Sequence, residues 1–234
     1  MRLFIIRHAD PDYPNNTITP AGHLEAKALA ERMKKIGLDT IYTSPLGRAV
    51  DTMRYTADAL QMPHEVAEWT AELGDCRIEL EPWGQFCVWD IPGESIRDRD
   101  PCMTPANWHS HHLLGNPLFK ETYNRVCRDS DAFLARHGYV REGGRYRVER
   151  GNRDRVAVFC HGGLGLWWLA HLLELPLPLM WTGFFLPPSS VTTVLFDERS
   201  QQWAVPRCLG VGDVSHLYAA GLPVQPAGIK ANVD

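Results

Sequence analysis

The 234-residue sequence lacks several features that would point to particular classes of protein. It has no surplus of basic residues, since 24 Lys and Arg side chains stand against 28 Asp and Glu side chains. The resulting net charge of -4 gives no general positive field that would attract nucleic acid or an anionic membrane. We therefore expect neither as a partner, and an anionic ligand would need a local pocket.

Long hydrophobic runs are also scarce. Only four consecutive apolar residues precede Arg7, too few for the core of a secretory signal. The most apolar stretch, 164–187, contains charged residues and prolines that a membrane helix would carry at considerable cost, so we expect it to be buried core. The six cysteines include no C-x-x-C pair and are typical of reduced thiols. These observations predict a folded protein of the cytoplasm.

What the sequence does contain is an alternating α/β pattern. Its 44% hydrophobic and 22% charged residues are ordinary values for a globular protein. Apolar β-branched runs predict buried strands, and amphipathic periodicity with capping signals predicts helices between them. The predicted strands are 2–6, 40–43 and 156–160, and the helices after the first two strands are 20–36 and about 46–60.

The remaining chain is less regular. The segment 74–117 is rich in Pro, Gly and Trp and lacks clear periodicity, which favours a functional lid inserted in the domain. A helix is expected to end near Gly138, a polar exposed loop to cover 141–154, and an antiparallel pair to form from 191–196 and 202–206. We expect one domain over 1–218, followed by an irregular tail, 219–234, with no visible contribution to the core.

Two of the predicted strands end in a histidine. His8 follows Arg7 at the end of the first strand, and His161 follows the strand 156–160. A single histidine there is more often structural than catalytic. Functional side chains nevertheless gather at the carboxyl edge of parallel sheets, so His8 and His161 meet if the two strands are neighbours. Arg7 and Arg48, which is one turn into the second helix, would add two guanidinium groups suited to a phosphoryl group.

These residues lie within a longer pattern that resembles the histidine phosphatase superfamily, the phosphoglycerate mutase-like proteins. The matching segments occur in family order: RH at 7–8, ITPAG at 18–22, TSPLGRA at 43–49, CHGG at 160–163 and GDVSHL at 212–217. The resemblance implies a three-layer α/β/α fold with a mostly parallel central sheet and a lid insertion. Gly162 follows the second histidine where another branch has Asp, so the resemblance favours the intracellular branch.

The resemblance also implies a division of roles. His8 is the nucleophile, while Arg7, Arg48 and His161 bind the phosphoryl oxygens. His161 is thereby also part of the catalytic set. The chemistry agrees, because a neutral imidazole attacks phosphorus without an activating base and cationic donors stabilise the charge on the equatorial oxygens. Neither a metal nor a cofactor is implied.

The proton donor is harder to assign from the sequence. The family takes a Glu or Asp that follows the second helix, and Glu72 is our choice, with Asp90 and Glu68 as alternatives. For each of them, an exposed carboxylate with no catalytic role is an equally good interpretation.

The lid contributes further candidates. We expect Trp89, His109 and His111 to contact substrate, because the histidines lack the carboxylate or Cys spacing of a metal site. The aromatic content of the lid suits a partly apolar or ring-bearing leaving group.

Three functional hypotheses follow. The first is a phosphatase that hydrolyses a small phosphomonoester through a phosphohistidine at His8. The second is a phosphoglycerate mutase, which holds the phosphorylated histidine for longer, and the third is a noncatalytic phosphoester-binding module. A cysteine phosphatase is excluded because Leu166 stands where Cys-x5-Arg needs Arg, and the GKS/GKT of a P-loop is missing. The expected partner is a small phosphorylated metabolite, and a homodimer is left open.

Overall fold

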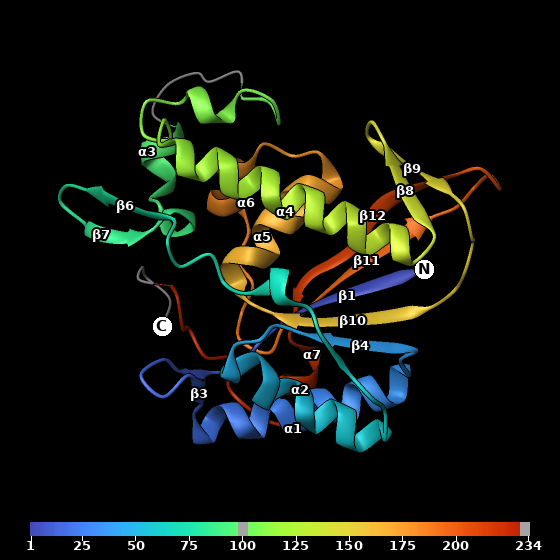
Figure 1. Cartoon of the computed structure of the whole chain (residues 1–234). Helices are drawn as coiled ribbons and strands as arrows, with labels where there is room; N and C mark the ends of the chain where they lie inside the picture. The colour runs from blue at the N-terminus through green and yellow to red at the C-terminus, as the bar shows by residue number, and fades with distance from the viewer. Residues whose placement is uncertain (98–102, 230–234) are drawn as a thin grey trace.

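A mixed eight-stranded sheet forms the centre of the molecule (Figure 1). The computed structural model describes residues 1–97 and 103–229. The strand order is β5-β4-β10-β1-β11-β12-β9-β8. The first four strands pair in parallel, and the pairs from β1 onward are antiparallel. Their bounds, in sheet order, are Glu65–Val66, Thr40–Thr43, Arg155–Cys160, Arg2–Arg7, Val191–Asp197, Trp203–Asp213, Arg145–Val148 and Tyr139–Glu142.

Strands β1 and β10, inside the sheet, are buried on both faces, which explains their nearly uninterrupted apolar sequence. Successive side chains of a strand point to opposite faces. In β1, Leu3 and Ile5 therefore join the core above the sheet, while Phe4 and Ile6 join the core below it. β10 divides its side chains in the same way.

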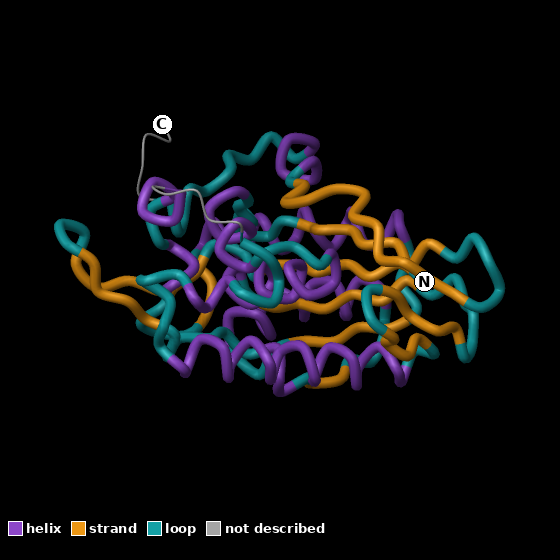
Figure 2. Tube along the Cα trace, turned by 90° about the horizontal axis from the view of Figure 1, so that it is seen from above, coloured by secondary structure: helices purple, strands orange, loops and turns teal. Residues whose placement is uncertain are grey.

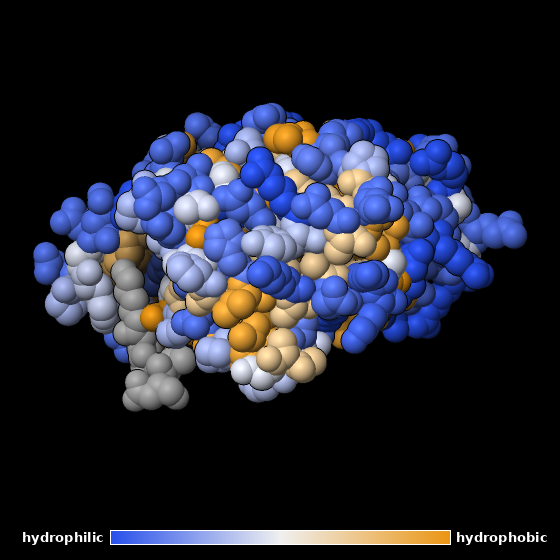
Figure 3. All heavy atoms as spheres, turned by 90° about the horizontal axis from the view of Figure 1, so that it is seen from below, coloured by the Kyte–Doolittle hydropathy of each residue, from blue (hydrophilic) through white to orange (hydrophobic). Residues whose placement is uncertain are grey.

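Helices cover both faces, giving the three layers that the resemblance implies (Figure 1). The upper layer consists of α4 (Pro117–Arg136), α5 (Gly162–Leu173) and α6 (Leu177–Gly183). The lower layer consists of α1 (Pro20–Ile36), α2 (Gly47–Leu60) and α7 (Ser215–Ala219). The outer surface of the lower layer is mostly hydrophilic, with apolar side chains gathered in one patch (Figure 3). Within the described residues, no helix is both long and apolar enough to cross a membrane.

Helix α1 shows how closely the local sequence sets an element. Thr19 adopts an extended conformation and its side chain accepts a hydrogen bond from the Gly22 amide, while Pro20 occupies the first helical position. Gly37 ends the helix at φ 73°, a conformation that favours glycine. The predicted helix 20–36 is confirmed.

The segment 74–117 has more regular structure than its sequence suggests. It contains the hairpin of β6 (Arg77–Leu80) and β7 (Gly84–Cys87), the 3-10 turns η2 (Val88–Asp90) and η3 (Trp108–Ser110), and helix α3 (Gly93–Arg97). The hairpin projects from one end of the molecule (Figure 2). Residues 98–102 of the predicted lid lie outside the described residues.

The expectation of an exposed loop over 141–154 was wrong for its first part. Strands β8 and β9 form a hairpin there and extend the sheet through β12. Gly143, at φ 64°, makes the turn, and the Gly143–Gly144 pair was the signal for a hairpin. The tyrosines of these strands, Tyr139 and Tyr146, are fully buried.

The tail has no strand or helix between α7 and Ile229, but it is not remote from the rest of the chain. The Ala227 carbonyl accepts a hydrogen bond from Arg7 at 3.1 Å. Gly228 and Ile229 line a cavity of about 790 Å³, called the main cavity below. No described residue of the tail belongs to the hydrophobic core, but the tail does meet a residue of the predicted site. Residues 230–234 lie outside the described residues.

Candidate active site

Parallel pairing of β1 with β10 brings the two predicted histidines together. Arg7 is in register with Cys160, so His8 and His161 follow at the same sheet edge. Their ring centroids are 5.2 Å apart, and 2% and 0% of the two residues are exposed. The condition stated for the sequence, that the two strands be neighbours, is met.

A hydrogen bond of the His8 ring shows which of its two nitrogen atoms carries the proton. Its Nδ1 atom lies 2.8 Å from the Ala9 carbonyl oxygen, which can only accept, so Nδ1 carries the proton. The Nε2 atom therefore has a free lone pair. Burial, and then the charges of Arg7 and Arg48, hold the pKa of His8 well below its usual range. At neutral pH the ring is therefore uncharged, the form in which an imidazole can act as a nucleophile without a partner base.

His161 is anchored from the neighbouring strand. Its Nε2 atom lies 2.7 Å from the hydroxyl oxygen of Ser44, which follows β4. Burial, and then the charges of His8 and Arg48, lower the pKa of His161 well below its usual range. Its buried Nδ1 atom has no hydrogen-bond partner among the described residues. If the Ser44 hydroxyl donates to Nε2, the remaining proton is on Nδ1, as an unused donor.

Like His161, each of the two arginines has at least one side-chain nitrogen that is hydrogen-bonded to the protein and one buried nitrogen that is not. Arg7 donates from Nη1 to the Leu186 carbonyl at 2.6 Å and from Nη2 to the tail. Arg48 donates from Nη1 to the side chain of Asn16 at 3.2 Å and lies over the ring of Tyr13. The Nε atoms of both arginines are buried and have no partner within the described residues. An unmade hydrogen bond of this kind costs about 1–3 kcal/mol, so three of them around one histidine indicate a site for an anion.

Arg7 and Arg48 line the main cavity of about 790 Å³, whereas His8 and His161 are not among the residues described as lining it. Glu72 and Gly162 also line it, together with residues of the lid segment, of α6 and the segment after it, and of the tail. Gly162 has no side chain, and a Cβ there would lie 3.3 Å from Nε of Arg7. The backbone at the start of α5 thus approaches the arginine closely, and its helix N-terminus faces the place where an anion would bind.

Glu72 lies at that same helix start. Its carboxylate accepts hydrogen bonds from the amides of Gly163 (3.1 Å), Leu164 (2.8 Å) and Leu73 (3.2 Å). These bonds and the charge of Arg48 favour the ionised form, but burial outweighs them and raises the pKa of Glu72 above its usual value. A carboxyl group that keeps its proton to higher pH is suited to act as a general acid.

Trp89 explains part of that burial. A Cβ at Gly163 would lie 2.5 Å from the Trp89 indole and 2.7 Å from Oε1 of Glu72, so ring, glycine and carboxylate are packed together. The indole thereby covers the carboxyl group. Trp89 also lines the cavity, as the sequence predicts for a substrate-lid residue.

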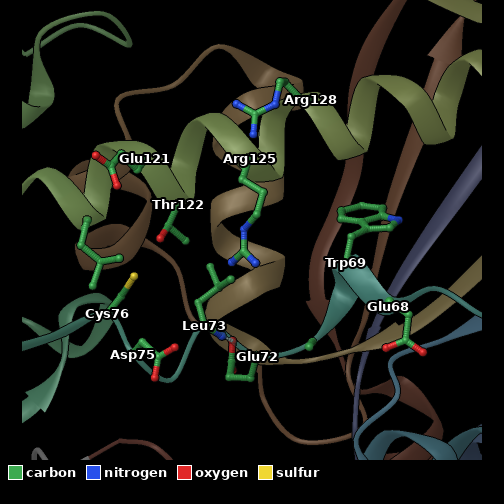
Figure 4. Close-up of a pocket in the computed structure, with 12 residues that line it drawn as sticks. Glu68, Trp69, Glu72, Leu73, Asp75, Cys76, Glu121, Thr122, Arg125 and Arg128 are labelled. Atoms are coloured by element: carbon green, nitrogen blue, oxygen red, sulfur yellow. Dashed lines mark hydrogen bonds between the residues drawn. The ribbon is translucent and has the colours of Figure 1, made fainter.

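The other predicted residues are placed differently. Asp90 lines the cavity, whereas Glu68 lines a second pocket of about 430 Å³, which Glu72 also lines (Figure 4). Among the residues described as lining the main cavity, His109 and His111 are absent. Nor do three His, Cys, Asp or Glu side chains gather as a metal site anywhere in the described part of the chain.

Glu25 is a residue that sequence reasoning missed. It lies on α1, is 2% exposed, and accepts a hydrogen bond from the Asp10 amide at 3.0 Å. Ser189 contacts two histidines: its amide donates to the His8 carbonyl at 3.0 Å, and its hydroxyl lies 3.1 Å from Nε2 of His216. Glu25 follows Gly22 by three residues and stands among apolar positions of the helix. A charged residue on the buried face of a helix was the sequence signal that could have identified it.

Comparison with known proteins agrees with this geometry. Residues 3–80 match the model of the histidine phosphatase superfamily (branch 1). The chain is also 29% identical, over 150 residues, to a 2,3-bisphosphoglycerate-dependent phosphoglycerate mutase of Brucella ovis. That alignment covers 51% of this chain and 72% of the relative.

Solved structures with similar folds cover nearly the whole chain. A phosphoserine phosphatase from Entamoeba histolytica, solved with phosphoserine, has a TM-score of 0.60 at 17% identity, over 92% of this chain and 98% of that one. A mycobacterial glucosyl-3-phosphoglycerate phosphatase has a TM-score of 0.57 at 19% identity, over 89% and 97%. At these identities the likeness shows the fold.

Gly163→Ala tests the packing of ring and carboxylate. We expect a net loss of unfolding free energy, because displacing a rigid indole costs about 1–3 kcal/mol, more than the helix propensity of roughly 1 kcal/mol that alanine adds. Urea unfolding measures it. Gly74→Ala is the control, since nothing lies within 4 Å of its added Cβ. Equal stability of Gly163→Ala and wild type would contradict the packing.

Glu25→Gln tests the buried carboxyl group by pH. Burial raises the pKa of Glu25 from 4.5 to about 7, against the opposing effects of the Asp10 amide, Ser189 and Arg7. Between these values the unfolded chain has released the proton and the folded chain retains it, so this group lowers stability as pH rises. The variant should therefore gain about 3 kcal/mol relative to wild type between pH 4.5 and pH 8.

The measurement is urea unfolding at both pH values. Glu31→Gln, at an exposed position of the same helix, corrects for the loss of one charge. A difference between Glu25→Gln and wild type that is independent of pH would show that the folded protein ionises Glu25 normally.

Proposed function

We propose that this chain, whose residues 3–80 match the model of the histidine phosphatase superfamily, is a member of that superfamily and hydrolyses a small phosphomonoester through a phosphohistidine at His8. The observation that carries the proposal is the set of buried, unpartnered nitrogen atoms around a neutral histidine. These are Nε of Arg7, Nε of Arg48 and Nδ1 of His161. Their arrangement is suited to the equatorial oxygens of a transferring phosphoryl group.

The first step transfers the phosphoryl group. Nε2 of His8 forms a bond to phosphorus while the bond from phosphorus to the ester oxygen breaks. The two arginines and His161 stabilise the charge on the three equatorial oxygens. Glu72 donates a proton to the departing oxygen, and the alcohol leaves.

The second step returns the enzyme to its starting state. Glu72, now ionised, takes a proton from water, whose oxygen attacks phosphorus as the bond to Nε2 breaks. Inorganic phosphate is released and His8 is again neutral. The Nδ1 hydrogen bond to Ala9 holds the ring orientation through both steps.

A mutase remains a second candidate, favoured by the Brucella relative. It would use the same first step and then return the phosphoryl group to a reoriented acceptor instead of to water. The two activities differ in the lifetime of the phosphohistidine, so they are separated by following the label on the protein and the product together.

His8→Ala tests the nucleophile. Incubation with a panel of phosphate esters that includes 3-phosphoglycerate should give inorganic phosphate and a transient acid-labile, base-stable label on wild type. The variant should lose both, with activity lower by at least a factor of about 10³, because the reaction has no other nucleophile. His64→Ala, at an exposed position, is the matched control.

Turnover by His8→Ala near the wild-type rate would refute the mechanism. A stable label with conversion of 3- to 2-phosphoglycerate would establish the mutase. No label with any ester would favour a noncatalytic binding module.

Glu72→Gln tests the general acid. An alkyl phosphate needs a proton on its leaving oxygen, whereas p-nitrophenyl phosphate does not. The variant should therefore lose about 10²–10⁴-fold in kcat/KM for the former and much less for the latter, because kcat/KM excludes the later attack of water, which both esters share. With the alkyl ester, wild-type activity should fall as pH rises through the elevated pKa of Glu72. The variant should lack that fall.

Glu68→Gln and Asp90→Asn are the matched comparisons, because both residues are alternative acids by sequence. If Asp90→Asn and not Glu72→Gln shows the dependence on leaving group, the acid is Asp90. Equal losses with both esters would assign Glu72 another role.

A further inference from the structure

The cavity extends well beyond the residues that would hold a phosphoryl group. Its volume of about 790 Å³ is in the range of pockets that enclose whole drug-sized ligands. Arg7, Arg48 and Gly162 make up only a small part of its lining. The rest is available to the leaving group, which sets the substrate class.

The walls of this second part are rich in aromatic rings from separate elements. Phe86 comes from β7, Trp89 from η2, Trp181 from α6 and Phe185 from the segment after α6. Phe86 and Trp181 are buried, at 5% and 4% exposure, so their places are fixed by the core. Rigid rings converging on one space favour a flat, ring-bearing group over a small flexible acid.

A third arginine faces the same cavity from the lid hairpin. Arg77 begins β6, pairs with Cys87 across the hairpin, and lines the cavity together with Cys87 and Gln85. Its side chain is exposed, and its recorded hydrogen bond is a long one, 3.9 Å from Nη1 to Sγ of Cys87. Among the residues that the structure describes, no carboxylate forms an ion pair with Arg77. The guanidinium is therefore available to an anion.

The charge balance of the cavity points the same way. Among the described residues, the acidic ones that line it are Glu72 and Asp90. Glu72 is biased toward its neutral form, and Asp90 is already engaged in an interaction of its own. Arg7 and Arg48 are placed for the phosphoryl group, so the charge of Arg77 is left for a second anionic group on the substrate.

We infer that the substrate is a phosphomonoester whose leaving group contains an aromatic ring and a carboxylate, and that Arg77 binds the carboxylate. This inference rests on the proposed phosphatase function. It makes Arg77 a residue that determines specificity for the leaving group, with the rings of the lid and α6 as the platform between the two anionic ends.

Three esters whose leaving alcohols have similar acidity test each part. They are ethyl, benzyl and 4-carboxybenzyl phosphate, and kcat/KM is measured for each with wild type, Arg77→Gln and Arg125→Gln. Arg125 is a matched control because it is also an exposed arginine, but it lines the second pocket and not the main cavity (Figure 4).

Wild type should prefer benzyl to ethyl phosphate, and 4-carboxybenzyl to benzyl phosphate by roughly tenfold, the modest value expected for a partly solvated ion pair. Arg77→Gln should lose the second preference and keep the first. Arg125→Gln should keep both. Comparing esters within each variant cancels any change in protein concentration or folding.

Other results would overturn the inference. A carboxylate preference that is absent in wild type, or that persists in Arg77→Gln, removes the role of Arg77. Equal use of ethyl and benzyl phosphate removes the aromatic platform. In both of these cases the esters are still hydrolysed, so the proposed phosphatase function stands. If neither these esters nor p-nitrophenyl phosphate is hydrolysed, the proposed function is overturned together with the inference.

Discussion

The parallel pairing of β1 with β10 is the constraint on which the site depends. The two strands are far apart in sequence, yet the register that joins Arg7 to Cys160 places His8 beside His161 with no further requirement. The same register buries alternating side chains of both strands in the two cores. A one-residue slip would exchange the faces of an entire strand, so the hydrophobic cores hold the histidines in place.

Electrostatics then decide the chemistry. Two arginines beside two buried histidines would be repulsive if the rings were protonated, and both rings are held neutral. Neutrality supplies a nucleophile, while the arginines keep their charge for the ligand. The unpartnered donors raise the free energy of the empty site. An anion bound as proposed would satisfy them, so part of the cost of folding would be returned as binding energy.

Much of this could be predicted from the sequence, for identifiable reasons. The strand ends at Arg7 and at Cys160, and helix α1 with its cap at Thr19, follow from local apolar patterns and capping signals. The features that the sequence did not predict depend on long-range contacts. The β8–β9 hairpin gains its burial only by pairing with β12, and the tail reaches Arg7 only because the chain doubles back after α7. Neither partner is visible in the local sequence.

The choice among carboxylates shows the same limit at the scale of one residue. Glu68, Glu72 and Asp90 are alike in the sequence, and nothing local distinguishes them. The fold separates them, since Glu68 does not line the main cavity and Glu72 accepts hydrogen bonds from two amides in the first turn of α5. Those amides favour the carboxylate, whereas burial under the Trp89 indole favours the acid. A group held between these opposing effects can both give up a proton and take one back, which the two steps of the reaction require.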